Sequence, residues 1–418
     1  MNSCLYKKWI VVYLVFVILL DFIGVASVVT LFPDLLLNSE HFFPTSFSGS
    51  TKFIAMGFML AIYPFGQFFG ASLLGKLSDH YGRKKLMILT LIGTFIGFVF
   101  SAIAVGIYSL VLLFVSRLIA GLCAGNVSIA QASLIDISEN EEQRTCYISY
   151  GQMAMGCAYI VGPVLGAWLS QASIVSWFNQ TTPFWFLSAL FFILFILTLV
   201  FYRETIKEKK TVSIEFLTGL KQIYSAFHNK KLNSAFQVWL IFVTGWWMFE
   251  SYLPSYLLKS LHFNTMQIGH LLAFNGALYA AFQYLVVQKI AKKLKAITMV
   301  RVSLCFVGLS IISIVFMTKT VALYFAMSLF VLSMGLAIPG LMTHISNLAG
   351  DEEQGQAMGM VGSIQAFSTV CVMILGGYLD GIHMNTTVLC GGFFVLLSWV
   401  FFVKKFGMSG RSSTQHSC

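Results

Sequence analysis

Charged residues are scarce in this sequence. Only 10% of the 418 residues are Asp, Glu, Lys or Arg, whereas 58% are hydrophobic. Because a soluble domain usually carries about 25% charged residues, this composition excludes a chain that folds entirely in water. The apolar residues form continuous runs of about 20 residues, the length at which a helix crosses a bilayer, without the alternation of a membrane β-barrel. The sequence therefore predicts an all-α integral membrane protein.

Motifs of several other protein classes are missing. There is no GxxxxGK[ST] phosphate loop, no HExxH zinc motif, no hydrolase triad and no TVGYG filter of a potassium channel. The eight cysteines form no CxxC pair and no cluster with histidine, which disfavours a disulfide framework or a zinc site. We therefore expect a protein that is not an enzyme, that holds no metal or cofactor and that does not consume ATP.

Twelve apolar stretches can be marked along the chain. They cover about residues 9–31, 53–74, 86–106, 108–135, 146–170, 181–202, 234–258, 267–289, 297–317, 321–348, 356–378 and 385–403. The longest polar connection separates six stretches from six. We expect an N-terminal bundle over residues 1–202, a cytoplasmic linker over 203–233, a C-terminal bundle over 234–405 and a cytoplasmic tail over 406–418.

The basic residues fix the orientation of this arrangement. With the N-terminus inside the cell, 22 of the 26 Lys and Arg residues lie on the cytoplasmic side, whereas Lys52, Lys259 and Lys319 lie outside and Arg117 lies within a stretch. Membrane proteins concentrate Lys and Arg in cytoplasmic loops. One missed helix would move every later loop to the other side, so we predict twelve spans with both termini cytoplasmic. The net charge of +10 then reflects topology and anionic lipid rather than nucleic acid.

The most specific motif connects the second and third stretches. It reads Gly75-Lys-Leu-Ser-Asp79-His-Tyr-Gly82-Arg83-Lys84-Lys85. Glycines allow the backbone to turn tightly and helices to approach closely. Asp79 can face the positive end of a neighbouring helix, and Arg83 can pair with an acid. The simpler alternative is an ordinary basic cytoplasmic loop.

This motif resembles the signature loop of the major facilitator superfamily. Further segments resemble the tetracycline/proton antiporters of that superfamily: Asp21-Phe-Ile-Gly24, Leu31-Phe-Pro33-Asp-Leu-Leu, Ser116-Arg117-Leu-Ile-Ala-Gly121, Gly162-Pro163-Val-Leu-Gly166, Arg203-Glu-Thr and Glu353-Gln-Gly355-Gln. The resemblance covers the N-terminal half well and the C-terminal half thinly. It implies the drug/proton antiporter branch, in which two six-helix bundles around a central cavity alternate between inward- and outward-open states.

The resemblance also implies a cytoplasmic latch. Asp79 and Arg83 would belong to it, with Asp136 at the end of the fourth stretch as the partner of Arg83. The glycines Gly75 and Gly82 belong to the same gating motif. The latch would hold the outward-facing state and would not touch substrate.

A helix-packing motif lies in the fifth stretch. Pro163 removes a backbone hydrogen bond and kinks a helix, and Gly162 and Gly166 permit close packing. By the resemblance, this is the antiporter motif, which suggests export. Ala158 and Ala167 stand where the family has glycine, so close packing alone remains an alternative.

Three charged residues lie within the apolar stretches and away from their ends: Asp21, Arg117 and Glu250. Each costs roughly 2.5–3.5 kcal/mol at mid-membrane, which suggests pairing, a proton site or a substrate contact. All three are candidates for proton coupling. The alternative for Asp21 and Arg117 is a static buried ion pair, and the alternative for Glu250 is a position near the external end of its helix.

Polar and aromatic side chains elsewhere in the stretches are candidates for a substrate cavity. They are Gln67, Asn126, Gln131, Trp246, Trp247, Asn275, His344 and Gln365. The two tryptophans offer flat contacts to an aromatic or cationic compound, although tryptophans also gather at membrane interfaces. Individually, each polar side chain more often forms a hydrogen bond between helices.

Two functions agree with these residues. The first is proton-coupled export of small amphipathic compounds, in which proton entry neutralises Asp21 or Glu250. The alternative is a carrier of the same fold for a specific metabolite or a siderophore-like metal chelator. An anionic substrate would bind Arg117, whereas a cationic substrate would bind Asp21 or Glu250. We expect a small-molecule substrate, protons and membrane lipid as partners, and a monomer that spans a bacterial inner membrane many times.

Overall fold

The computed structural model describes residues 3–38, 41–43, 48–206, 218–229, 231–349, 354–383 and 385–406. Residues 207–217 and 230 of the predicted linker, the tail beyond residue 406 and Glu353 of the last matching segment lie outside the described residues. Within them the regular structure is helical and contains no β-strand, which confirms the all-α prediction.

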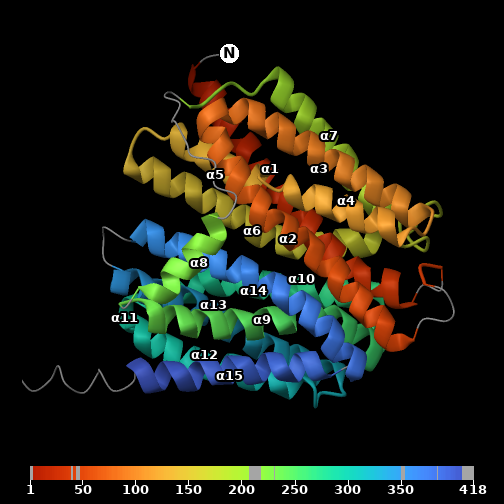
Figure 1. Ribbon diagram of the computed structural model, residues 1–418, viewed down its shortest axis with the longest axis vertical. Coiled ribbons are helices and arrows are strands. Elements are labelled where there is room, and N and C mark those ends of the chain that lie inside the picture. Colours follow the sequence, from red (N-terminus) through yellow and green to blue (C-terminus); the bar gives the residue numbers. More distant parts are fainter. Residues whose placement is uncertain are drawn as a thin grey trace, which may run out of the picture. The chain divides into compact units, whose positions relative to one another are not determined.

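The first half of the chain begins with a 31-residue helix (Figure 1). The elements in order are α1 (Ser3–Pro33), the π-helix η1 (Asp34–Asn38), α2 (Gly49–Tyr81), α3 (Arg83–Gly106), α4 (Leu110–Leu122), α5 (Asn126–Asp136), α6 (Glu141–Leu169) and α7 (Thr182–Val200). Polar side chains cap several of these helices. The Ser109 hydroxyl accepts a hydrogen bond from the amide of Leu112, and the Asn140 side chain accepts one from the amide of Gln143, which satisfies amides that a helix start leaves unpaired.

The second half continues with shorter elements as well as long helices. They are α8 (Thr218–His228), α9 (Asn233–Ser260), α10 (Thr265–Phe282), the π-helix η2 (Gln283–Val287), α11 (Gln288–Lys293), α12 (Ala296–Ile314), α13 (Thr320–Ala349), α14 (Gln354–Ile382) and α15 (Thr386–Phe406).

Eleven helical segments among the described residues are long and apolar enough to cross a membrane. They correspond to eleven of the twelve predicted stretches. The twelfth, 234–258, forms α9, which carries Glu250 and several Trp, Tyr and Ser residues and is therefore less apolar. Most of α9 is buried, because α14 and α15 pack against it. A helix shielded by its neighbours does not need the uniformly apolar surface of a lipid-facing one.

The chain divides into two compact units. The first contains Met1–Thr218 and Phe263–Gly276, and the second contains Gly219–His262 and Ala277–Cys418. In the first unit, α1 packs on α6, α3 packs on α4 and α7, and α2 packs on α4. In the second, α15 packs against both α9 and α12 (Figure 1).

A pair of glycines permits a close contact between two helices of the second unit. A Cβ atom on Gly245 of α9 would lie 2.5 Å from the carbonyl oxygen of Gly391 on α15, and a Cβ on Gly391 would lie 2.8 Å from that of Gly245. Small residues let two backbones approach where lipid supplies no hydrophobic drive for association. The contact explains how α9 and α15 pack along much of their length.

Candidate functional site

Asp21 lies in the middle of α1 and is only 4% exposed. Its Oδ1 accepts a hydrogen bond from Nδ2 of Asn126, at 3.1 Å, and the same amide group donates to the Thr94 hydroxyl at 3.1 Å. The Asn126 Oδ1 atom is buried without a hydrogen-bond partner among the described residues. The carboxyl group therefore faces neutral polar groups from α3 and α5.

Arg117 lies on α4 and is 2% exposed. Its Nη2 donates to the Ser101 hydroxyl at 2.5 Å, and its guanidinium carbon lies 4.8 Å from the ring centre of Phe98 and 5.9 Å from that of Phe184. Aromatic faces attract a guanidinium group, but they do not neutralise its charge. Its Nε has no hydrogen-bond partner among the described residues.

The static ion pair expected as the alternative is not formed. The ion pairs within the described part of the chain are Lys7–Glu139, Arg83–Asp79 and Arg83–Asp136, and none involves Asp21 or Arg117. Each of these two charges is thus buried in the first unit with neutral neighbours. Such groups can accept a proton or an oppositely charged ligand without first breaking an ion pair.

Glu250 lies on α9 in the second unit and is half-buried. One turn earlier, the rings of Trp246 and Trp247 stack with centres 5.3 Å apart and an interplanar angle of 28°. The Trp247 Nε1 atom is buried without a partner among the described residues. An acid beside two stacked indole rings can contact a cationic or aromatic compound.

The remaining cavity candidates lie in different surroundings. Gln67 on α2, Gln131 on α5 and Gln365 on α14 are half-buried. Asn275 on α10 is buried, and its Oδ1 has no partner among the residues described. His344 on α13 packs edge-on against Phe402 and Phe406, with ring centres 5.4 and 4.6 Å away, so aromatic side chains surround it.

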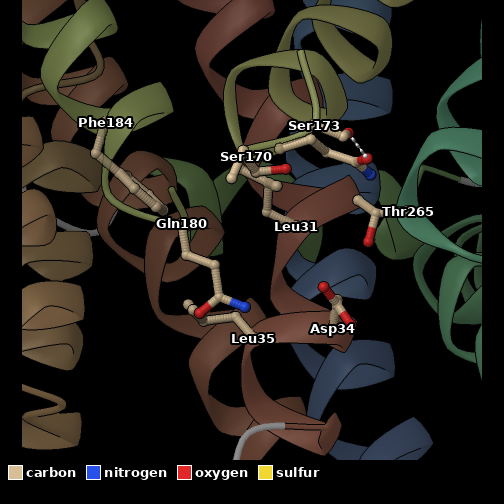
Figure 2. Close-up of a pocket in the computed structure, with 10 residues that line it drawn as sticks. Leu31, Asp34, Leu35, Ser170, Ser173, Gln180, Phe184 and Thr265 are labelled. Atoms are coloured by element: carbon tan, nitrogen blue, oxygen red, sulfur yellow. Dashed lines mark hydrogen bonds between the residues drawn. The ribbon is translucent and has the colours of Figure 1, made fainter. Parts of the chain in front are cut away.

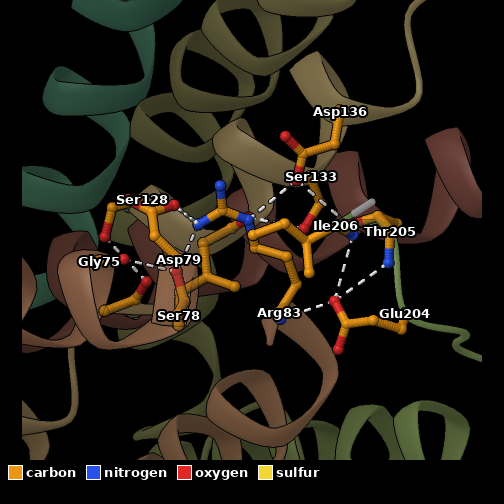
Figure 3. A network of polar contacts seen from close by, with 12 residues as sticks. Gly75, Ser78, Asp79, Arg83, Ser128, Ser133, Asp136, Glu204, Thr205 and Ile206 are labelled. Carbon is orange, nitrogen blue, oxygen red and sulfur yellow. Dashed lines mark hydrogen bonds and ion pairs between the residues drawn. The ribbon is translucent and has the colours of Figure 1, made fainter. Parts of the chain in front are cut away.

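A charged cluster lies where α2 passes into α3 (Figure 3). Arg83 Nη1 lies 2.6 Å from Asp79 Oδ1 and 2.5 Å from the Ser78 hydroxyl. Its Nε lies 2.9 Å from Oδ2 of Asp136, at the end of α5. Two carboxylates therefore bind one largely buried guanidinium group, and the three residues join α2, α3 and α5. Fork-like donors make arginine well suited to such a double contact.

Glu204 completes this cluster, although the sequence analysis gave it no role. Its carboxylate accepts hydrogen bonds from the backbone amides of Arg83, at 2.8 Å, and Lys84, at 3.2 Å. These amides are the first of α3, so the acid caps the positive end of that helix. Glu204 belongs to the Arg203-Glu-Thr segment that resembles the antiporters, but its contact with α3 becomes visible only in the fold.

Gly82 is the hinge between α2 and α3 and has φ of 108°. L-residues with a side chain rarely adopt this conformation. A Cβ atom here would also lie 2.4 Å from Oε2 of Glu204. The glycine therefore permits both the turn and the close approach of the capping carboxylate. The nearby Gly75 contacts Ser78, whose hydroxyl donates to its carbonyl oxygen at 2.6 Å.

Tyr202 supports the same cluster from beyond the end of α7. It is fully buried and donates from its hydroxyl to the Ser133 hydroxyl at 2.7 Å. Burial raises the pKa of Tyr202 to about 12, so the phenol remains neutral. The neighbouring Thr205 hydroxyl donates to Asp136 Oδ2 at 3.4 Å. The segment after α7 thus contacts both α3 and α5.

The glycines of α6 permit close contact with α1. A Cβ atom on Gly162 would lie 2.6 Å from the Cβ of Ala26, and one on Gly166 would lie 3.1 Å from Ser27. The Ser27 hydroxyl donates to the carbonyl oxygen of Gly162 at 2.8 Å, next to Pro163. The packing motif thus places α6 directly against the helix that carries Asp21.

Comparison with known proteins identifies the family of this chain. A sequence model described as Major Facilitator Superfamily matches residues 14–373. The chain belongs to the major facilitator superfamily.

Curated members of the superfamily with similar sequences are named for drug resistance. The tetracycline resistance protein of class H from Pasteurella multocida is 25% identical over 381 residues, which cover 88% of each chain. Multidrug resistance protein 1 of Bacillus subtilis (strain 168) is 25% identical and covers 90% of this chain and 93% of its own. Quinolone resistance protein NorA of Staphylococcus aureus (strain COL) is 23% identical, with 91% and 92% covered.

Solved structures of other members share the fold. A D-xylose-proton symporter has a TM-score of 0.74 at 16% identity and covers 96% of this chain and 98% of its own. The human organic anion transporter MFSD10 (TETRAN) has a TM-score of 0.70 at 19% identity, with 95% and 99% covered. This major facilitator protein is therefore a multi-pass membrane protein and a secondary transporter of small molecules.

One further acid of this major facilitator protein escaped the sequence analysis. Asp380 on α14 is 3% exposed, and its Oδ1 accepts a hydrogen bond from the amide of Thr387, at 3.2 Å, in the first turn of α15. The predicted stretch ended at residue 378, so Asp380 fell into a loop. Because helix ends are uncertain by a few residues, a slightly longer stretch would have included it. In the part of the chain that the structure describes, no three His, Cys, Asp or Glu residues gather as metal ligands.

Proposed function

We propose that this transporter couples export of small amphipathic compounds to the entry of protons, by alternating access. The observation that carries the proposal is the buried carboxyl group of Asp21, which contacts the neutral amide of Asn126 at 3.1 Å and forms no ion pair with a described residue. An ionised carboxylate in such a place is costly, and a bound proton removes the charge. Coupling to a proton gradient requires a site of this kind inside a bundle.

The location of Asp21 connects protonation to helix movement. The residue lies on α1, which packs against α6 through Ala26, Ser27 and the glycines of the packing motif. Since that contact leaves little free space, a change in charge on α1 acts on both helices together. Such closely packed pairs move between discrete arrangements more easily than they deform.

The charged cluster at Arg83 supplies a latch in this proposal. It lies at the end of the first unit that contains many basic residues, which the positive-inside rule places in the cytoplasm. Arg83 joins helices α2, α3 and α5 and stabilises one of the two states. Both termini are then cytoplasmic, and the protein works as a monomer in a bacterial inner membrane, with no cofactor.

The second unit contributes the Glu250 region. A carboxyl group next to two stacked indoles suits a compound that combines a positive charge with an aromatic ring. The names of the similar proteins refer to resistance to tetracycline, quinolones and several drugs, and export from the cytoplasm is the transport direction that produces resistance. We therefore assign amphipathic, drug-like compounds as the substrate class.

The test uses purified protein in liposomes with an imposed pH gradient. Tetracycline, ethidium and a panel of metabolites are measured on both sides of the membrane, with protein-free liposomes as the control. We expect tetracycline or ethidium to move against the inward flow of protons, and collapsing the gradient to stop this movement. Accumulation of a metabolite in the direction of proton flow, or transport that ignores the gradient, would contradict the proposal.

A second candidate substrate class follows from Arg117. Its Nε is unpaired among the described residues, and aromatic rings hold the guanidinium group without neutralising it. An anionic metabolite or a carboxylate-bearing metal chelator would find a binding group here. In the same liposomes, Arg117→Gln should then abolish transport of the anion while ethidium transport persists. Equal loss of both activities would reject an anion-specific role.

A further inference from the structure

The first unit contains a pocket of about 260 Å³ at the C-terminal end of α1 (Figure 2). The Lys7–Glu139 ion pair lies at the other end of this helix. It is bounded by the last turn of α1 and η1, by the end of α6 with the segment that follows, and by the starts of α7 and α10. Three lining residues, Leu31, Asp34 and Leu35, belong to the segment around Pro33 that resembles the antiporters, and the other lining residues lie outside the motifs discussed above. The pocket is thus separate from Asp21 and from the Arg83 cluster.

Among the described residues that line the pocket, Asp34 is the only charged one. Its Oδ1 accepts a hydrogen bond from Nδ2 of Asn38 at 2.7 Å, which orients the carboxylate. Among the described residues, the carboxylate has no cationic partner. A concave site with one negative charge and no basic side chain attracts cations and repels anions.

The backbone at Asp34 is unusual. Pro33 ends α1, and the chain continues as the π-helix η1 from Asp34 to Asn38. Proline supplies no amide hydrogen and disturbs the regular bonding of its helix. A π-turn is uncommon and occurs often at functional sites, because it changes the direction of a side chain at the expense of regular helix geometry. Here the first residue of the π-helix, Asp34, lines the pocket.

The rest of the lining suits a small organic cation. Thr265 and Ser170 contribute hydroxyl groups, and Gln180 contributes an amide, all of which can accept hydrogen bonds from an ammonium group. Leu31, Leu35 and Phe184 form an apolar wall, and Figure 2 shows these groups arranged around one space with Asp34 and Thr265 on the same side. Ligand pockets are usually about 300–1,000 Å³, so this one suits a compound near the lower limit.

We propose that this pocket is a binding site, separate from the buried Asp21, for a small amine or quaternary ammonium compound, with Asp34 as its anionic anchor. The ammonium group lies against the free oxygen of Asp34, and the apolar part lies along Leu31, Leu35 and Phe184. The proposal concerns binding alone, so it stands or falls independently of the transport direction and of proton coupling.

The test measures binding calorimetrically in lipid nanodiscs without any pH gradient. Benzylamine is the charged probe, benzyl alcohol its neutral counterpart and benzoate its anionic counterpart. The intact protein should bind benzylamine best and benzoate least. Asp34→Asn should weaken benzylamine binding by about tenfold or more while changing benzyl alcohol binding by less than about twofold, because only the charge is removed. Asp34→Glu should retain most of the affinity for benzylamine.

A second variant fills the pocket. Ser170→Trp should abolish binding of both benzylamine and benzyl alcohol, and Ile174→Trp, at an exposed position nearby that does not line the pocket, is its matched control. Size-exclusion profiles and thermal unfolding check that each variant is folded. Unchanged benzylamine binding in Ser170→Trp or in Asp34→Asn would overturn the proposal.

Discussion

Charged residues in the first unit have two opposite kinds of surroundings. At the junction of α2 and α3, Arg83 has a carboxylate on each side and Glu204 caps the following helix. Deeper in the unit, Asp21 and Arg117 are almost completely buried, yet each contacts only neutral groups. The paired charges join helices, whereas the unpaired ones keep a costly charge available for a proton or a ligand. Buried polar groups that lower the stability of a protein are expected at its functional sites.

The largest effect is expected at Asp21. Asp21→Asn retains the shape and the contact with Asn126 but cannot exchange a proton. We expect proton-driven transport in liposomes to fall to the level of empty liposomes, while exchange of substrate across the membrane without a gradient continues. Both activities are measured on the same preparation. If gradient-driven transport persists, Asp21 is not the coupling site and the contrast between the two groups of charges loses its functional meaning.

A smaller but clear effect is expected from Arg83→Gln. The change leaves Asp79 and Asp136 without their cation, and we expect the free energy of unfolding to fall by about 1–3 kcal/mol, below the full value for a deeply buried pair because both acids are partly exposed. The transport rate should decrease, but the number of protons per substrate should stay the same. Thermal unfolding measures the first effect, and simultaneous proton and substrate fluxes measure the second. A changed proton ratio would place Arg83 in the coupling machinery.

The cap on α3 should contribute about 1 kcal/mol, the usual value for an N-terminal capping side chain. Glu204→Ala removes it, and Gly82→Ala introduces a Cβ atom that conflicts with the same carboxylate and with a φ of 108°. The double variant should therefore lose less free energy of unfolding than the sum of the losses in the two single variants. Additive losses in thermal unfolding would show that Gly82 acts through backbone conformation alone.

The smallest effect is expected at the exposed Lys7–Glu139 pair, which serves as the control for the other changes. The Glu139 side chain is 72% exposed, so Glu139→Gln should change the free energy of unfolding by less than about 0.5 kcal/mol and leave transport intact. Unfolding curves and liposome transport test this together. A large loss of stability or of transport in this variant would mean that pairing and burial do not explain which charged residues contribute to stability and transport.

Much of the fold followed from local sequence features. Long apolar stretches predicted the helices, and all twelve stretches are helical among the described residues. The motif from Gly75 to Lys85 predicted the family, and the pairing of Arg83 with Asp136 was expected from the resemblance before the structure placed them 2.9 Å apart. The proposed roles of Asp21, Arg117 and Glu250 stay predictions that transport measurements must decide.

Other features depended on contacts between distant segments. Glu204 lies 121 residues from Arg83 in sequence, and nothing in either segment alone indicates that one caps the helix of the other. Asp380 was missed because the helix continues past the predicted end of its stretch. His344 stays a candidate for a cavity, and the sequence did not indicate its contact with two phenylalanines of α15.

The sequence by itself determined that the chain is helical, lies in a membrane and belongs to the major facilitator superfamily, because hydrophobic length and a short glycine-rich motif are local properties. The tertiary structure decided which charges are neutralised, because ion pairing depends on helices far apart in sequence meeting at a few ångströms. It therefore separated Asp21 and Arg117, which no described charge neutralises, from Arg83, which two carboxylates hold. It also formed the pocket at Asp34 from four separate segments of the first unit.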